Sequence, residues 1–444
     1  MVSGYVDGAN LKSRLRDKMA GTAQTGAASS SAKTPAAPRS AHVARKYQSR
    51  QNAIVEAASA VLNRKGLKGM TLADVGEPLG LVGTGVAYYF ASKEALTAAC
   101  YMRSLGVFEQ LIAGAAAAGP SPEERLGGFV RGYFTMRKRI ALGEMAPIAQ
   151  FDDVRTLADQ AVIDAYVVMF RNLRRLFGAL EDRGVARFAI TERAHHLLHQ
   201  FLWVEAWLPK YDAQDFDRLA EKVLDVFLHG LASGEAHWPP SRLAAPHFHA
   251  AGKDEAYQTF LRAATQMLND HGYLGASVER IAAKLEMTKG AFYHHIDAKD
   301  DLVTICFARS SDIVRGTQRA SLQMPASGCD RLASALMSLV QHHLDGEAPL
   351  LRAATVSLPE TIRRQVMLAY DRNAVLFGSM LSDAMADGSA RQIDVQIGAH
   401  LLNGAVNGIA ELPYWLPNPP VGDAAEQFVR PLFDGLLSTW KDRS

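Results

Sequence analysis

The stretch TKGAFYHHIDAKDDL, residues 288–302, decides how the rest of the chain is interpreted. It gathers small, hydroxyl, cationic and aromatic polar side chains in one short segment, directly after the apolar-periodic run VERIAAKLEM. A blurred copy, VGTGVAYYFASKEAL, occupies residues 82–96. The two stretches therefore indicate a duplication within the chain.

The duplication extends well beyond these stretches. SRQNAIVEAASAVLNRKG and DEAYQTFLRAATQMLNDHG both place apolar residues at i, i+3, i+4 and i+7, the rhythm of a helix with one buried face. The shift that takes Gly66 to Gly272 also aligns Lys93 with Lys299 without a gap. With small gaps the likeness continues to the end of the chain. We call the two halves copy one and copy two.

Strand signals are almost absent, so the sequence predicts an all-α protein. Each copy is expected to hold a three-helix unit with a helix-turn-helix, followed by a larger helical domain. The predicted divisions are a flexible basic tail (1–44), the first helix-turn-helix unit (45–105), the first larger domain (106–233), a linker (234–252), the second helix-turn-helix unit (253–311) and the second larger domain (312–444).

Composition excludes several classes of protein. The 444 residues are 48% hydrophobic and 21% charged, with a net charge of +2, which is ordinary for a globular protein and does not identify a polyanion partner. No apolar run is long enough to span a bilayer, no secretory signal is evident, and the three cysteines are sparse, so we expect a cytoplasmic protein without a membrane partner. Nucleophile-elbow, HExxH and phosphate-loop motifs are all missing, so the sequence predicts neither an enzyme nor a cofactor.

Each short unit is predicted to be three helices. Gly66 and Gly272 are expected to end the first helix, because glycine adopts the left-handed backbone that closes many helices. Thr71 and Ser277 are then expected to cap the second helix. The third helix, which carries the opening stretch in copy two, is expected to enter the major groove of DNA.

The residue types of that third helix suit DNA. Thr288 and Lys289 lie at its start, where side chains reach base edges, and Gly290 allows a close approach to DNA. Three further side chains can donate to phosphates, which position a protein without reading sequence: Tyr293, His294 and Lys299. A scaffold role without DNA is the alternative, which such phosphate-reaching residues disfavour.

SVERIAAKLEMTKGAFYHHIDAKDDL resembles the N-terminal DNA-binding domain of the tetracycline-repressor family, and TLADVGEPLGLVGTGVAYYFASKEAL resembles it too. In each copy the resemblance covers most of the short helix-turn-helix unit. It implies all-helical subunits whose larger domain binds a small molecule and dimerises through its last two helices. Members are mostly repressors that the ligand releases from DNA.

The first copy departs from this pattern. Pro78 stands where copy two has Lys284 and should interrupt the second helix. Gly83 and Ala87 replace Lys289 and Tyr293. Copy one either contacts mostly the DNA backbone or has lost DNA contact. Its candidate DNA-binding residues are Thr71, Gly83, Thr84, Tyr88, Tyr89 and Lys93.

Other residues admit two interpretations. Cys100 and Cys306 occupy matching positions and could be redox sensors, although small buried residues are the plainer interpretation. The linker histidines 237, 247 and 249 match no familiar metal-ligand spacing. Candidate ligand-binding residues are Tyr166, Phe170, His199 and Trp203; interface packing is the alternative for the last two, because their helix matches the family's dimerising helix. We expect the working effector pocket in copy one, which carries more aromatic residues there.

The family's mode of dimerisation predicts pairing within one chain. Helices around 192–208 and 215–233 should pack against those around 394–412 and 423–440, and a further homo-oligomer is possible. Apolar residues expected at or near this contact are Leu198, Leu202, Phe227, Leu402, Leu432 and Leu436. The sequence thus favours a regulator that binds double-stranded operator DNA as a pseudo-dimer, and a small, largely apolar effector. The alternative is a ligand-binding or interaction protein whose helix-turn-helix units no longer touch DNA.

Overall fold

The computed structural model describes residues 41–151, 159–233, 255–284, 299–345, 358–408 and 424–439, with the isolated residues 157, 238, 240 and 243. These residues form helices joined by loops and no β-strand, although one isolated antiparallel bridge joins Ala232 to Ala390. The predicted all-α class is therefore confirmed for this part of the chain. It divides into two compact units, Met1–Phe108 with Met145–Met169, and Glu109–Glu144 with Phe170–Ser444.

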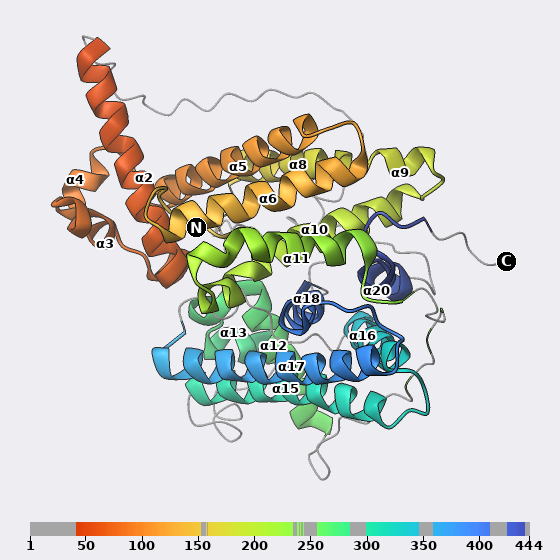
Figure 1. Ribbon diagram of the computed structural model, residues 1–444. Helices are drawn as coiled ribbons and strands as arrows, with labels where there is room; N and C mark the ends of the chain where they lie inside the picture. Colours follow the sequence, from red (N-terminus) through yellow and green to blue (C-terminus); the bar gives the residue numbers. More distant parts are fainter. Residues whose placement is uncertain are drawn as a thin grey trace. The chain divides into compact units, whose positions relative to one another are not determined.

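Figure 1 labels the α-helices of both units. In chain order the α-helices are α2 (Ala41–Gly69), α3 (Leu72–Gly76), α4 (Gly83–Ala87), α5 (Lys93–Ala117), α6 (Pro122–Ala141), α8 (Gln160–Arg175), α9 (Ala179–Asp182), α10 (Arg187–Trp207), α11 (Phe216–His229), α12 (Glu255–Gly275), α13 (Val278–Lys284), α15 (Lys299–Leu322), α16 (Gly328–Leu344), α17 (Glu360–Ala386), α18 (Val395–Gly408) and α20 (Ala424–Asp434). In the part of the chain that the structure describes, none of them combines the length and the apolar character that a membrane span requires.

The first unit is built around α2. Ile54, Ala58 and Val61 on one face of this helix are almost fully buried, as their helical spacing predicts. The helix changes direction at Gly66, whose φ of 65° lies in the left-handed region that glycine adopts without strain. The short helices α3 and α4 and the start of α5 complete the helix-turn-helix.

The second unit contains the larger domain of copy two together with α10 and α11 of copy one. In α11, the buried residues Phe216, Leu219, Val223 and Phe227 recur at helical spacing and give one apolar face. In copy two, α15, α16, α17 and α18 pack on one another, while α10 and α11 contact α18 and α20 (Figure 1). Helices from both copies thus share one core in this unit.

The repeat is visible in the backbone. Gly66 and Gly272 have φ of 65° and 66° and stand at matching positions after the first helix of each copy. Gly184 and Gly388, a second matching pair further along the copies, have φ of 85° and 80°. The two glycines of the second pair are slightly closer in sequence than those of the first pair. Copy two is therefore slightly shorter than copy one between its helix-turn-helix unit and this second glycine. The tertiary structure therefore preserves the duplication seen in the sequence.

Candidate nucleic-acid interface and ligand cavity

The second helix of copy one, α3, begins with a capping box. Thr71 Oγ1 accepts a hydrogen bond from the Asp74 amide at 3.2 Å, and Asp74 Oδ2 accepts one from the Thr71 amide at 3.0 Å. The ammonium of Lys65, 2.7 Å from Asp74 Oδ1, lowers the pKa of that carboxyl, and the Thr71 bonds act in the same direction. Thr71, which the sequence offers as a DNA-binding residue, has a side chain engaged in starting α3.

Pro78 has the local effect that the sequence predicts. The regular α-helix ends at Gly76 and continues as a single 3₁₀ turn over Glu77–Leu79, because proline cannot donate the next helical hydrogen bond. Gly80 then takes a φ of 65°, and the Leu81 amide donates to the Gly76 carbonyl at 2.9 Å. In copy two, α13 is α-helical through Lys284, the residue that matches Pro78.

The third helix of copy one, α4, presents an aromatic surface. A Cβ on Gly83 would lie 3.4 Å from the backbone nitrogen of Ala73, an ordinary contact distance, so α4 packs closely on α3 at this point. Thr84 is exposed, and Tyr88 is 72% exposed. Tyr89 lies 5.1 Å from Tyr88 and 4.9 Å from Tyr47 of α2, measured between ring centroids. We call Tyr47, Tyr88 and Tyr89 the tyrosine cluster.

Cations beside the tyrosine cluster are held by backbone carbonyls. Lys93 Nζ donates to the carbonyl of Lys68 at 3.4 Å, and Arg50 donates to the carbonyl of Leu79 at 3.0 Å. Arg45 and Lys46, on the first turns of α2, are exposed. Arg45 and Lys46 are thus more exposed than Arg50 and Lys93.

In copy two the described residues flank 285–298, the segment in which the sequence predicts the third helix. Ser277 Oγ accepts a hydrogen bond from the Arg280 amide at 3.3 Å and so caps α13, as predicted. Lys299 begins α15, and its Nζ lies 4.3 Å from the centroid of the Tyr273 ring. Tyr273 donates to Asp300 at 2.5 Å, and burial together with that carboxylate raises the pKa of Tyr273 to about 12. The predicted contacts Thr288, Lys289, Gly290, Tyr293 and His294 lie outside the described residues.

The paired cysteines match the plainer of their two interpretations. Cys100 and Cys306 are both fully buried, and burial raises the pKa of their thiols to about 11 and about 12. A buried, protonated thiol is a poor nucleophile. The linker histidines 237, 247 and 249 lie outside the described residues, and within the described ones no group of three His, Cys, Asp or Glu side chains could hold a metal.

The four candidate ligand residues are divided between two environments. Tyr166 is packed against Phe151, with ring centroids 5.3 Å apart, and Phe170 is fully buried. His199 and Trp203 lie where α10 contacts α18, and Trp203 meets the ring of Tyr370 at 5.4 Å. These positions correspond to the interface alternative for His199 and Trp203.

A small cavity lies in copy two, between α15, α17 and α18, with room for roughly one or two water molecules. Its polar lining is Ser310, Ser311, Tyr370, Asn373, Asn403 and Asn407. Ser311 donates to Asn373 Oδ1 at 3.2 Å, and Asn403 Nδ2 donates to the carbonyl of Tyr370 at 3.3 Å. The sequence did not single out this cavity, although comparing matched positions would have, because Leu105 and Met169 of copy one stand where Ser311 and Asn373 do.

The last helices of the two copies cross with a near-twofold pattern. The Leu231 amide donates to the Leu432 carbonyl at 3.1 Å, and the Leu436 amide donates to the Phe227 carbonyl at 2.7 Å. Each of these bonds converts into the other under the shift in numbering that relates Gly230 to Gly435. These two glycines have positive φ, and a Cβ on either would lie within 2.4 Å of a carbonyl oxygen across the crossing.

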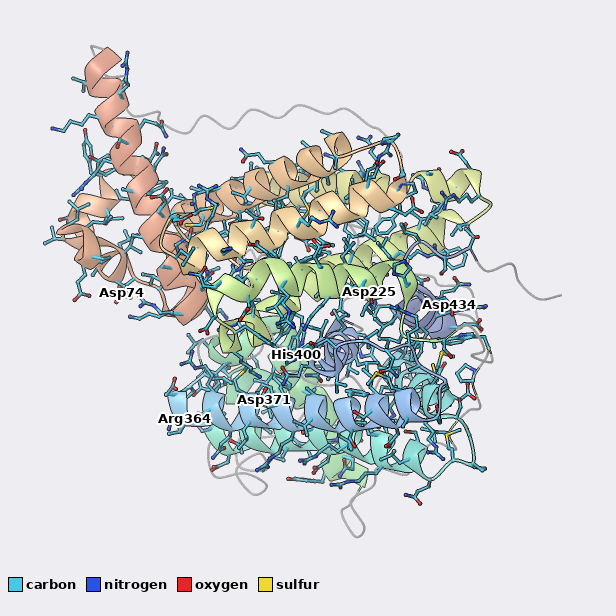
Figure 2. The ribbon with its side chains drawn as sticks, viewed as in Figure 1. Asp74, Asp225, Arg364, Asp371, His400 and Asp434 are labelled. Atoms are coloured by element: carbon cyan, nitrogen blue, oxygen red, sulfur yellow. The ribbon has the colours of Figure 1, made fainter. Side chains whose placement is uncertain are left out.

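Ion pairs and a ring stack join copy one to copy two beside this crossing. Arg391 bonds to Asp225 at 3.0 Å and to the Gly230 carbonyl at 2.8 Å. Lys210 pairs with Asp371, and Lys222 pairs with Asp394. The Trp207 ring stacks on His400 with centroids 4.8 Å apart; Figure 2 labels Asp225, Asp371 and His400. Sequence reasoning missed these residues, because such partners depend on how helices far apart in sequence are aligned.

The fold and these units define a duplicated, all-helical protein of the helix-turn-helix class. The family model "Bacterial regulatory proteins, tetR family" matches the chain twice, at residues 54–100 and 260–304. Both matches fall on the helix-turn-helix units expected from the sequence, so the chain is similar to this family in those two regions.

A curated relative and several solved structures are also similar. The chain is 29% identical over 89 residues to the Transposon Tn10 TetC protein of Escherichia coli, a match that covers 20% of this chain and 43% of that protein. The regulator PfmR from Thermus thermophilus is 18% identical, covering 40% of this chain and 98% of its own, with a TM-score of 0.34. AibR in complex with isovaleryl coenzyme A and operator DNA is 23% identical with the same coverage and TM-score.

Proposed function

We propose that this protein is a ligand-responsive transcriptional regulator, a repressor released from its operator by a small effector. The observation that carries the proposal is the family match at two places in the chain, in each of which a hydroxyl side chain caps the second helix of the predicted unit. A protein of this function works in the cytoplasm, where the DNA is, and needs no enzymatic activity. The chain would bind as a pseudo-dimer of its two copies, which the near-twofold hydrogen bonds of Leu231 and Leu436 support.

The two DNA-binding units are expected to contribute unequally. Copy two carries Thr288 and Lys289, whose side-chain chemistry suits base reading, whereas copy one has Gly83 at the position of Lys289. The alternative, a unit that no longer binds DNA, is favoured for copy one alone by the shortened α3 and by the internal bonds of Arg50 and Lys93. Its exposed tyrosine cluster and basic neighbours still suit contacts to phosphates.

A gel shift on the chain's own upstream DNA, with a salt titration, tests the proposal. Lys299→Ala should weaken binding to every sequence and flatten the slope of log affinity against log salt by about one unit. Lys93→Ala, at the matching position in copy one, should show whether that unit contacts DNA. Arg139→Ala removes an exposed cation from α6 and serves as the control. The proposal fails if the chain binds this DNA no better than unrelated DNA.

For the effector, the aromatic content of the sequence predicts a pocket in copy one, whereas the small polar cavity among the described residues lies in copy two. The cavity beside Asn373 and Asn403 combines apolar walls with amides and hydroxyls but has room for only about one or two water molecules, so an effector there would need α15, α17 and α18 to move apart. Copy one instead has the bulkier Leu105 and Met169 at two of these positions, both almost fully buried. We infer an effector that is largely apolar and has a hydrogen-bonding group.

Thermal shifts over a panel of small metabolites would locate the effector site. A hit should protect the wild type and His199→Leu, and lose its effect in Asn403→Leu, because only the second change removes an amide from the cavity. The two variants occupy matching positions in the two copies and therefore control for each other. The reverse result would place the effector in copy one.

A further inference from the structure

Helices α10 and α18 occupy the same place in the two copies and lie against each other. The shift in numbering that takes Gly184 to Gly388 also matches Gln200 to Gly404, so each of these residues faces the position equivalent to its own. The side chains at this contact are nevertheless very different. Around it, α10 carries His199 and Trp203 where α18 carries Asn403 and Asn407. At this contact α10 carries the bulky side chains, and α18 carries smaller residues that leave room for them.

The glycines of α18 are what admit the side chains of α10. A Cβ on Gly404 would lie 2.5 Å from Gln200 Oε1 and 2.8 Å from Trp203 Cδ1. A Cβ on Gly408 would lie 3.1 Å from His199 Cβ. Distances below 3.0 Å force something to move, so residue 404 tolerates no side chain while α10 keeps its present one.

Two side chains of α10 hydrogen-bond to backbone carbonyls of α18. Gln200 Nε2 donates to the Leu401 carbonyl at 2.8 Å, and His195 Nε2 lies 3.1 Å from the Gly408 carbonyl. The matched residues of copy two, Gly404 and Ala399, have no side-chain polar group to return either bond. The polar contacts therefore need α10 on one side and α18 on the other.

From this geometry we propose that copy one and copy two accept only each other as partners. Two α10 helices crossing in the same way would set Gln200 against Gln200, with Trp203 beside them, and would be overpacked. Two α18 helices would set Gly404 against Gly404 and leave unfilled space without the Gln200 bond. The inference rests on the pairing of copies in the proposed function and adds that neither copy can pair with itself.

Cleavage of the linker tests this exclusivity in the whole protein. A protease site inserted after Leu243 would let the full chain fold before it is cut. The fragments would then be unfolded in urea, refolded together and weighed by native mass spectrometry. We expect one-to-one complexes with the summed mass of both fragments, about 48.2 kDa apart from the insert. Homodimers of either fragment, or fragments that separate, would overturn the inference.

Two variants sharpen this experiment. Gly404→Gln gives α18 the side chain of α10 and should raise the dissociation constant of the cut complex at least about tenfold. The exchange Gln200→Gly with Gly404→Gln should recover part of that loss, because it removes the contact with Gln200 while the Trp203 ring still meets the side chain at residue 404. Gly106→Ala, a helical glycine whose added Cβ meets no atom within 4 Å, is the control. Failure of the exchange to recover pairing would also count against the inference.

The fragment experiment measures assembly and the gel shift measures DNA binding, so the two proposals can fail independently. A chain that binds no DNA but whose fragments pair exclusively would lose the proposed function and keep this inference. A chain that binds its operator while its fragments form homodimers would keep the proposed function and lose this inference.

Discussion

Two contacts join copy one to copy two, and they differ in symmetry. The crossing of the last helices keeps equivalent interactions from both copies, whereas the contact of α10 with α18 does not. At the crossing, Gly230 and Gly435 make equivalent approaches to backbone carbonyls, and the bonds of Leu231 and Leu436 mirror each other. A short distance along the chain, α10 and α18 have lost this symmetry. Backbone contacts tolerate few side chains, so they keep both copies alike, whereas side-chain contacts are free to diverge.

A tandem chain permits this divergence for a physical reason. In a homodimer with twofold symmetry, one surface must complement itself, so every substitution appears on both sides of the interface. When both partners lie in one chain, a bulky residue on one helix can be matched by a glycine on the other. Gln200 opposite Gly404 is such a match.

The largest expected effect comes from removing a bulky side chain of α10. Trp203 is only 5% exposed and lies between Tyr370 and Gly404, so Trp203→Ala should lower the free energy of unfolding by about 3–5 kcal/mol. Urea unfolding followed by circular dichroism measures this change. Val375→Ala, at a 73% exposed position on α17, should stay within about 0.5 kcal/mol. A loss below about 1 kcal/mol for Trp203→Ala would mean that α10 and α18 do not pack as described.

A second expected effect concerns His196, a buried histidine of α10 whose ring lies against Phe428 of α20. Burial, with the neighbouring His199, lowers the pKa of His196 to about 3, below the 6.5 of a free imidazole. The unfolded chain therefore binds more protons below pH 6.5, and stability should fall as the pH falls towards the folded pKa. Each such group contributes about 1.4 kcal/mol per pH unit, or about 2 kcal/mol between pH 6.5 and 5. Burial raises the pKa of Glu192, which acts in the opposite sense, so the total slope mixes several groups.

A variant isolates the contribution of His196. His196→Gln keeps a neutral polar side chain beside Gln200 and should remove about 1.4 kcal/mol per pH unit from the slope between pH 6.5 and 5. Urea unfolding at several pH values gives the slope. His229→Gln changes an exposed imidazole on α11 and is the matched control. Equal slopes for the His196 variant and the wild type would show that this imidazole is not buried in the neutral form.

Much of the fold could be predicted because its signals are local. Thr71, Gly66 and Pro78 each act within one turn of their own position, so the cap, the end of the first helix and the interrupted α3 could be read from the sequence. The all-α class followed from helical periodicity. The segment 285–298 of copy two, in which the sequence predicts the second recognition helix, lies outside the described residues.

The interface residues could be predicted only in part. The apolar periodicity of α10 shows that Trp203 is buried but not which surface it meets, so ligand pocket and interface stayed equal alternatives. The partners of Asp225 and His400 come from helices of the other copy, far away in the sequence, and no local pattern specifies them. Comparing residues at matched positions is the signal that finds Gly404 and the cavity beside Asn373, because it shows where the copies diverged.

Pro78 and the turn at Gly80 could each end α3 early in copy one, and the smallest expected effects compare these two causes. Gly80 has a φ of 65°, and a Cβ there would meet no atom within 4 Å, so Gly80→Ala should cost only the backbone strain, about 1 kcal/mol. Pro78→Ala should change stability by less than about 0.5 kcal/mol, because the Leu81 amide still bonds to Gly76 and keeps the turn in place. Thermal unfolding of the full chain measures both. If Pro78→Ala instead stabilised the protein by more than about 1 kcal/mol, proline alone would account for the difference between α3 and α13. The turn at Gly80 would then follow from the proline instead of fixing where α3 ends.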